Sequence, residues 1–294
     1  MTLKKLIYVG LDFIYSKDKN LYFLEANSTP GAIGKYKEKY KNVKPIKELC
    51  NLLNKKYKIL AIISRYNWNK FEISKDYRKY FKGKIFVCPY AKNKKRMKKG
   101  DGSLITEKNK IIMPDVILRV SANYAKAQEK AGIKVINSEK VVKLTLDKLK
   151  TKKLVKKYTN IKVPRAFVIK SNKGINKIPK IILNKPFILK PRRGQKSKGL
   201  LICNSNKDIP KKLKIKEDYL LEELIDCEKL FKNEFFEIRS MAVNGKYAGS
   251  MLFVSPNRPM HLFTQGRVEK TPKFIENKIK IATEKIVKVL DKYC

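Results

Sequence analysis

Three oxygen-bearing side chains near the N-terminus have the types and spacing of a metal site. Asp12 lies in the apolar stretch of residues 10–14, and Glu25 and Asn27 lie in residues 21–31, after a short turn. The two stretches predict a β-hairpin. Because alternate side chains of a strand share a face, Glu25 and Asn27 point the same way, and Asp12 can face them from the neighbouring strand. Two carboxylates and an amide suit a hard cation such as Mg²⁺, which also binds substrate phosphates.

A basic loop that contains glycines lies at residues 190–199, between two predicted strands. Its glycines let backbone N–H groups turn toward a ligand, and its cations add positive charge, so the loop can fold over a triphosphate. An ordinary basic hairpin turn has a similar composition. The residues concerned are Lys190, Arg192, Arg193, Gly194, Lys196, Ser197, Lys198 and Gly199.

Two acidic stretches follow the basic loop. Residues 221–225 read as a strand that leads into a linker, where a carboxylate and backbone groups could meet an adenine edge, with Asp226 or Glu228 near the ribose. Further on, Glu237 and Arg239 share one strand face. These two residues either belong to a functional site or form an ordinary salt bridge across that strand face.

An alternation of strands and helices has to position these groups. Before residue 140 it implies a small, mostly parallel α/β sheet. The strands expected there are residues 59–63, 84–88, 115–120 and 133–136, and the helices are residues 46–54 and 124–131. After residue 140 we expect helices at 141–158 and 274–293, extended segments at 162–169 and 186–202, a strand at 219–225, and a hairpin of residues 235–243 and 246–254 that turns at Asn244 and Gly245.

The order of these motifs resembles the ATP-grasp superfamily. In that family a lysine near the end of a helix precedes the first ATP-binding strand, as Lys148 does, and a second lysine precedes the flexible loop, as Lys190 does. The family's Glu-Glu-hydrophobic-Ile linker is similar to residues 222–225. The resemblance implies an α+β or α/β ATP-grasp fold. ATP would then contact Lys148, Lys190, Gly194, Ser197, Gly199, Glu222, Glu223, Ile225 and Glu228.

The metal and catalytic motifs of the family also have counterparts. Its acid-hydrophobic-arginine triplet resembles residues 237–239, and its aspartate followed by Glu-x-Asn resembles Asp12 with residues 25–27. The resemblance makes Asp12, Glu25 and Asn27 ligands of Mg²⁺ or Mn²⁺. It makes Arg239 and Arg258 catalytic, with Arg258 similar to the arginine that steadies an acyl phosphate.

The chain departs from the family in the order of its parts. The metal strands usually follow the last helix, whereas here they begin the chain, so joining Cys294 to Met1 would restore the usual order. This predicts a circularly permuted ATP-grasp fold with a small inserted α/β domain that resembles the pre-ATP-grasp domain. We expect residues 1–44 as the metal-binding hairpin, 45–140 as the small domain, and 141–213 and 214–294 as the two ATP-grasp subdomains. His261 and residues 264–267 replace the family's asparagine and double glycine.

The resemblance implies an ATP-dependent ligase that joins a carboxylate to an amine or thiol through an acyl phosphate. The composition admits another function class, because the 294 residues carry a formal net charge of +44. Such a charge attracts polyanions such as nucleic acid, and the ATP-grasp body would then be structural or degenerate. An acidic substrate or a lysine-biased proteome would also explain the charge. Aromatic residues beside the lysines are Tyr66, Trp68, Tyr77, Tyr80 and Phe81.

Several classes are disfavoured by the sequence. No apolar run approaches the roughly 20 residues of a membrane span, and the N-terminus lacks a signal-peptide pattern. The five cysteines form no CxxC pair and there is one histidine, which disfavours a zinc site or a disulfide framework. We therefore expect a soluble, cytoplasmic protein.

Overall fold

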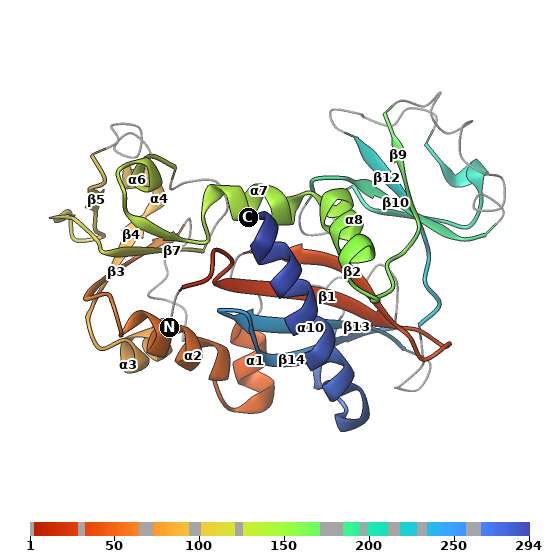
Figure 1. Ribbon diagram of the computed structural model, residues 1–294, viewed down its shortest axis with the longest axis horizontal. Coiled ribbons are helices and arrows are strands. Elements are labelled where there is room, and N and C mark those ends of the chain that lie inside the picture. Colours follow the sequence, from red (N-terminus) through yellow and green to blue (C-terminus); the bar gives the residue numbers. More distant parts are fainter. Residues whose placement is uncertain are drawn as a thin grey trace.

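In the residues that it describes, the computed structural model contains three β-sheets of four or five strands and one two-stranded sheet; Figure 1 shows their arrangement. The structure describes residues 3–28, 33–64, 73–93, 101–120, 126–170, 185–194, 199–210, 218–227, 234–256 and 266–294. Helices and sheets are mixed in this arrangement, which confirms the mixed α and β fold class that the sequence predicts.

The central sheet is antiparallel, with the strand order β15-β14-β13-β1-β2. The N-terminal hairpin β1–β2 thus pairs directly with the late hairpin β13–β14. Asn244 and Gly245 join β13 to β14 with φ of 47° and 85°, the left-handed conformation that a two-residue hairpin turn requires. Both predicted hairpins are therefore confirmed. The strands are β1 (Tyr8–Tyr15), β2 (Leu21–Asn27), β13 (Phe235–Val243), β14 (Lys246–Ser255) and β15 (Arg267–Lys270).

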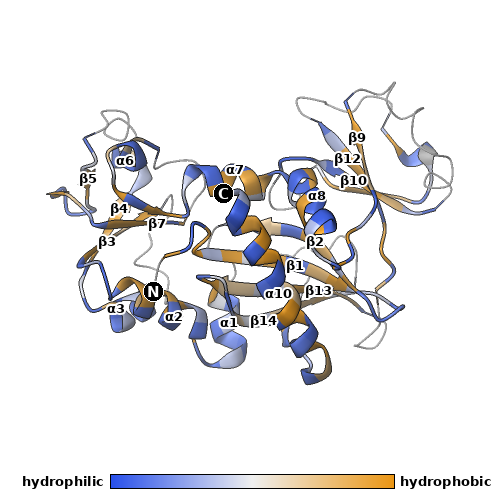
Figure 2. Cartoon of the chain, viewed as in Figure 1, coloured by the Kyte–Doolittle hydropathy of each residue, from blue (hydrophilic) through white to orange (hydrophobic). Residues whose placement is uncertain are grey.

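One face of the central sheet packs against helices α7, α8 and α10. Leu11, Phe13 and Ile238 are buried there with Ile279 and Ile286 of α10. In Figure 2, β1 is mostly hydrophobic and α10 carries both hydrophobic and hydrophilic residues, as expected of a helix that covers a sheet. The helices on the two faces of the sheet are α1 (Ile33–Tyr40), α2 (Lys44–Leu53), α7 (Glu139–Leu146), α8 (Lys148–Tyr158) and α10 (Lys273–Tyr293).

The opposite face of the central sheet changes character along β13. At one end Met241 and Val243 are buried in a cluster that includes residues of α1 and α2. At the other end the same side of the strand carries Glu237 and Arg239, because every second side chain shares a face. This polar end lies outside the apolar cluster formed with α1 and α2.

The helix predicted over residues 141–158 is wrong in one respect, because α7 and α8 are separated at Asp147. Asp147 has φ −86° and ψ 90°, and its carboxylate accepts a hydrogen bond from the backbone N–H of Lys150. It is therefore the N-cap of a second helix. Arg192 holds this carboxylate from the neighbouring sheet, with both Nε and Nη2 at 2.8 Å.

The second sheet is parallel, with the order β4-β3-β7-β8, and confirms the small parallel sheet that the sequence predicts before residue 140. The short antiparallel pair of β5 and β6 comes between β4 and β7 in the sequence. The elements are β3 (Ile59–Ser64), α3 (Ile73–Tyr80), β4 (Lys84–Pro89), α4 (Tyr90–Asn93), β5 (Leu104–Ile105), β6 (Ile111–Ile112), β7 (Val116–Arg119), α6 (Lys126–Lys130) and β8 (Lys134–Ile136).

The third sheet is antiparallel and has the order β11-β10-β12-β9. It carries the basic loop between β10 and β11 and the acidic end of β12. Its core contains Phe187, Leu189 and Leu221. The elements are β9 (Ala166–Ile169), β10 (Phe187–Pro191), β11 (Leu201–Cys203), the 3₁₀ helix η3 (Asn206–Asp208) and β12 (Tyr219–Glu223).

The two ends of the chain lie beside each other. Lys5 Nζ donates to the backbone oxygen of Cys294 at 2.9 Å, and Leu6 N donates to Asp291 Oδ1 at 2.8 Å. The permuted arrangement requires neighbouring ends, and it stays a prediction here. Among the described residues, no helix has the length and apolar character needed to cross a membrane.

Candidate active site

The N-terminal hairpin brings Asp12, Glu25 and Asn27 together. Asp12 lies opposite Glu25 in the register of β1 and β2, and Gly10 lies opposite Asn27. Asn27 Nδ2 donates to Asp12 Oδ2 at 2.9 Å. The three oxygen-bearing side chains that the sequence predicts as a set are therefore neighbours.

Arg239 of β13 is the principal partner of Asp12. Its Nε and Nη2 donate to the two carboxylate oxygens at 2.6 and 2.7 Å, and Asp12 is 1% exposed. Burial opposes the charge on Arg239, but Asp12 outweighs burial and raises the pKa of the guanidinium. The sequence suggested Glu237 as a possible partner of Arg239, whereas the ion pair of Arg239 in the described structure is to Asp12.

Glu237 lies two residues before Arg239 on the same side of β13. Burial, together with the charge of Asp12, raises the pKa of Glu237 to about 8. A carboxyl group with such a pKa titrates near neutral pH, which is a common property of residues in functional sites. Glu237 therefore adds a titratable group beside the oxygen cluster.

A buried cluster of lysines and one glutamate faces the hairpin from the third sheet and α8. Glu222 is 1% exposed and contacts Lys152 Nζ through Oε1 and Lys190 Nζ through Oε2, the latter at 2.9 Å. Lys148 Nζ donates to the backbone oxygen of Gly194 and lies 3.5 Å from Glu25 Oε2. The contact of Lys148 with Glu25 joins the lysine cluster to the metal-site candidates.

Charge is unevenly balanced in this cluster, because two ammonium groups share one carboxylate. Burial raises the pKa of Glu222, but Lys152 and Lys190 outweigh it and the pKa is lowered. Burial opposes the charge of Lys190 as well, yet Glu222 raises its pKa. Burial lowers the pKa of Lys152 to about 7, and the neighbouring Lys190 contributes to the decrease. A multiply charged anion near this cluster would gain from the excess of positive charge.

Lys152 is a site residue that sequence reasoning missed. It lies one helical turn after Lys148 on α8, and residues four apart share a helix face. The spacing was therefore a usable signal. The abundance of lysine along α8 concealed it, since six of the eleven residues in KLKTKKLVKKY are lysines that have to be compared before two are selected.

The basic loop is described in part. Arg192 binds Asp147 and also Asp218, at 3.0 Å, and Arg193 lies 3.4 Å from Asp147. These arginines thus have protein partners. Gly199 has φ 73°, and a Cβ there would lie 3.1 Å from Pro191 Cγ, so glycine suits this position. Ser197, Lys196 and Lys198 lie outside the described residues, as do Glu228, Arg258, His261, residues 264–265 and Trp68.

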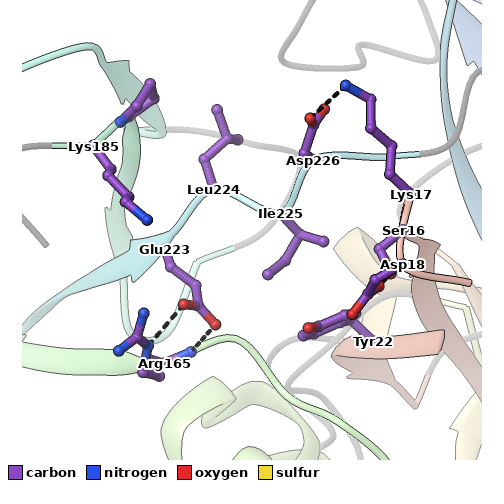
Figure 3. Close-up of a pocket in the computed structure, with 11 residues that line it drawn as sticks. Ser16, Lys17, Asp18, Tyr22, Arg165, Lys185, Glu223, Leu224, Ile225 and Asp226 are labelled. Atoms are coloured by element: carbon purple, nitrogen blue, oxygen red, sulfur yellow. Dashed lines mark hydrogen bonds and ion pairs between the residues drawn. The ribbon is translucent and has the colours of Figure 1, made fainter. Parts of the chain in front are cut away.

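The predicted linker residues separate onto two sides of β12. Glu222 points to the lysine cluster, whereas Glu223 pairs with Arg165 at 2.8 Å. Figure 3 shows Glu223 and Ile225 at a pocket of about 310 Å³, which Tyr22 also lines, and Asp226 pairs with Lys17 at 2.7 Å. This pocket adjoins the linker on the side away from Glu222.

The oxygen cluster has the donor types that a hard cation requires. In the described chain, no three His, Cys, Asp or Glu side chains gather as a metal-binding group. The set here instead combines two carboxylates with one amide. Glu25 has a side-chain exposure of 28%, so its carboxylate can be reached by an incoming ion. These residues fit Mg²⁺ or Mn²⁺, which take oxygen ligands and share them with phosphates.

The structure is similar to several solved structures that are described as ligases or synthetases. A putative gamma-glutamylcysteine synthetase from Methylobacillus flagellatus has a TM-score of 0.68 and 11% identity, over 99% of this chain and 89% of that chain. The D-alanine–D-alanine ligase from Bacillus anthracis, complexed with ATP, has a TM-score of 0.52 and 16% identity, over 79% and 78%. D-alanyl-alanine synthetase A from Vibrio cholerae gives 0.54 and 14%, over 80% and 81%.

The chain therefore has the ATP-grasp fold that the sequence motifs indicate. No protein-family model and no curated sequence matches it. The similarity is therefore one of three-dimensional structure, since the sequence identities to these proteins are low.

Proposed function

We propose that this chain is an ATP-dependent ligase that joins a carboxylate to an amine or thiol, with ADP and phosphate as products. One observation carries the proposal. The oxygen cluster of Asp12, Glu25 and Asn27 adjoins the lysine cluster of α8 and β10, because Lys148 of α8 contacts Glu25. Oxygen ligands for a cation and ammonium groups for phosphates thus adjoin each other within the ATP-grasp fold.

In this proposal the triphosphate of ATP lies between the hairpin and the lysine cluster. Lys148 and Lys190 contact its phosphates, and Lys148 would exchange its backbone partner, Gly194, for a phosphate oxygen. Glu222, released in part from Lys190, and the backbone near Ile225 contact the adenine. From the family resemblance we assign Gly194, Ser197 and Gly199 to phosphate binding, and Glu223 and Glu228 to binding of the nucleoside.

Asp12, Glu25 and Asn27 would hold Mg²⁺ or Mn²⁺ in this site. When bound, such an ion neutralises negative charge on the phosphates during transfer. Arg239 orients the Asp12 carboxylate through its two hydrogen bonds. A mutant that lacked these bonds would leave a buried carboxylate without its cation, which is costly.

The proposed reaction has two steps. An oxygen of the substrate carboxylate attacks the γ-phosphorus, the bond from that phosphorus to the bridging oxygen breaks, and ADP leaves with that electron pair. An amine or thiol then attacks the acyl carbon, the carbon–oxygen bond to phosphate breaks, and the nucleophile loses a proton. Cations such as Lys148, Lys190 and Arg258 stabilise the transferring charge in a site that excludes water.

A screen for ADP release tests the proposal. L-Glutamate with L-cysteine is the first pair to try, because one structural neighbour is described as a putative gamma-glutamylcysteine synthetase; a panel of other carboxylates and amines follows. The proposal predicts ADP release that requires both a carboxylate and Mg²⁺. ADP release with neither, or none with any pair, would contradict it.

The charge of +44 favours a second candidate function, the binding of a polyanion such as nucleic acid. Measurements of nucleic-acid binding at several salt concentrations and of Mg·ATP binding separate the two functions. Nucleic-acid binding that falls steeply with salt, in a protein that does not bind Mg·ATP, would favour the second function. Mg·ATP binding at physiological salt favours the ligase.

We also propose that the fold is circularly permuted, with residues 1–44 as the metal hairpin, 45–140 as the small domain, and 141–213 and 214–294 as the ATP-grasp subdomains. The neighbouring ends of the chain support it, since Lys5 contacts Cys294. Permutation is tolerated where the ends of a domain adjoin at its surface.

A further inference from the structure

Arg119, the last residue of β7, is a buried arginine whose guanidinium is mostly unpaired. It is 2% exposed. Its Nη1 donates to the backbone oxygen of Asn137 at 3.3 Å, whereas Nε and Nη2 have no hydrogen-bond partner within the described part of the chain. Arginine keeps its charge in proteins, and a buried charge without a partner is costly. A ligand that accepts hydrogen bonds from the guanidinium of Arg119 would explain why a buried charge stands at this position.

The unpaired atoms of Arg119 form the edge with which arginines in this same protein bind carboxylates. Arg239 holds Asp12 with Nε and Nη2, at 2.6 and 2.7 Å. Arg192 holds Asp147 with the same two atoms, at 2.8 Å each. Such a fork matches the two oxygens of a carboxylate. Arg119 thus presents the same donor pair without an acceptor among the residues that the structure describes.

The acidic residues near Arg119 do not take this role. Burial lowers the pKa of Arg119, and the charges of Glu129 and Glu139 oppose the decrease. Both acids make other contacts: Glu129 Oε2 accepts from Glu139 N at 2.9 Å, and Glu139 pairs with Lys143 at 3.0 Å. They lower the cost of the buried charge without bonding to the free edge.

Arg119 also lies where parallel sheets bind ligands. The sheet order is β4-β3-β7-β8, so the chain leaves β3 toward one edge of the sheet and leaves β7 toward the other. Ligands of open α/β sheets bind outside the carboxyl ends of the strands, at the position where the connections diverge. Arg119 is at the carboxyl end of β7, beside Ile63 of β3.

A short path of contacts connects Arg119 to the candidate active site. Asn137, which accepts from Arg119, donates through Nδ2 to the backbone oxygen of Ser28 at 3.0 Å. Ser28 directly follows Asn27 of the oxygen cluster. Asn137 Oδ1 also accepts from Ile7 N at 2.9 Å, just ahead of β1. Arg119 is therefore close to the oxygen cluster but is separated from it by Asn137 and Ser28.

From these observations we propose that Arg119 binds a carboxylate of a ligase substrate, and that this carboxylate is not the one that reacts with ATP. The substrate is then an amino acid or a dicarboxylate, anchored by one acidic group at the small parallel sheet while its reacting group reaches the oxygen cluster. The inference rests on the ligase function proposed above. The anchored group belongs either to the activated acid or to the nucleophile, and the experiment separates these two sources.

Matched probes test the inference. L-Glutamate is compared with 4-aminobutyrate, and L-cysteine with cysteamine, because each second compound lacks the α-carboxylate. Binding to the wild type and to Arg119→Met is measured by calorimetry in the presence of Mg²⁺ and a non-hydrolysable ATP analogue. Arg78→Met, an exposed arginine of α3, is the control. ATP-analogue affinity and the thermal unfolding midpoint are measured for every variant.

We expect the wild type to bind the α-carboxylate member of at least one pair more tightly, and Arg119→Met to lose about 10- to 100-fold of that affinity. The pair that responds identifies the substrate that is anchored. Affinity for the ATP analogue should not change. The unfolding midpoint without ligand should stay the same or rise, because an unpaired buried charge has been removed.

Equal binding of both members of each pair by the wild type would overturn the inference. A preference for the α-carboxylate member that is the same in the wild type and in Arg119→Met would also overturn it. So would a wild type that binds inorganic phosphate at Arg119 but none of the carboxylate probes. A markedly lower unfolding midpoint of Arg119→Met would assign a structural role to the arginine. Failure of the ligase function would be seen separately, as a wild type that does not bind the ATP analogue.

Discussion

Replacing Glu222 by glutamine should destabilise the protein strongly, because two buried lysines depend on this carboxylate. The side chains of Lys152 and Lys190 are 3% and 10% exposed, and both contact Glu222. Removing one partner of a buried ion pair costs about 3–5 kcal/mol. Since 1 kcal/mol lowers the melting temperature of a chain of this size by roughly 2–4 °C, we expect a decrease of roughly 6–20 °C.

The loss should depend on pH in a definite direction. Without Glu222, both lysines would have pKa values in the folded state below their value of about 10.4 in the unfolded chain. The unfolded state then binds more protons than the folded state, so the stability of the variant rises with pH. Lys152, whose pKa is already about 7, should lose its proton first. The deficit of Glu222→Gln relative to the wild type should therefore be smaller at pH 9 than at pH 6.

Urea unfolding of the wild type, Glu222→Gln and Glu223→Gln at both pH values provides the test. Glu223 is a matched control, because it is the adjacent glutamate and pairs with Arg165, whose side chain is 58% exposed. An exposed pair contributes about 0–1 kcal/mol. Equal losses in the two variants, or a deficit of Glu222→Gln that does not change with pH, would refute the reasoning about the buried cluster.

Two further predictions concern Glu237 and the order of the chain. Burial and Asp12 raise the pKa of Glu237 from 4.5 to about 8, so its stabilising effect is present at low pH and is lost as the pH rises through 8. In urea unfolding, Glu237→Gln should gain stability relative to the wild type between pH 5 and pH 8; a constant difference contradicts this. A chain that begins at residue 45, with residues 1–44 joined after Cys294, should fold and bind Mg·ATP; a rearranged chain that stays unfolded, by circular dichroism, contradicts the permuted arrangement.

The parts of the site that the sequence predicts are those that local geometry determines. Asp12, Glu25 and Asn27 belong to one hairpin, and alternation along two adjacent strands is sufficient to bring them together. The hairpin at Asn244 and Gly245 is equally local, because its turn depends on two residues. Such features need no knowledge of the tertiary structure.

The missed parts of the site depend on contacts between distant segments. Arg239 pairs with Asp12 because β13 lies beside β1, and no spacing in the sequence reveals that neighbour. The break at Asp147 had a local signal, an N-cap residue, but apolar residues continue across it and Arg192 comes from another sheet. Lys152 and Arg119 are recognised by what surrounds them: a shared carboxylate in one case and a missing acceptor, among the described residues, in the other.

The most direct test of the ligase function measures the binding of ATP with and without Mg²⁺, together with ADP release, for the wild type, Glu25→Ala and Glu38→Ala. Glu38 is an exposed glutamate of α1 that pairs with Lys35, so its loss controls for the change of charge. We predict Mg²⁺-dependent ATP binding and substrate-dependent ADP release in the wild type and in Glu38→Ala. Glu25→Ala should keep its fold, by circular dichroism, and lose ADP release. Full activity of Glu25→Ala, or a wild type that does not bind Mg·ATP, would contradict the proposed function.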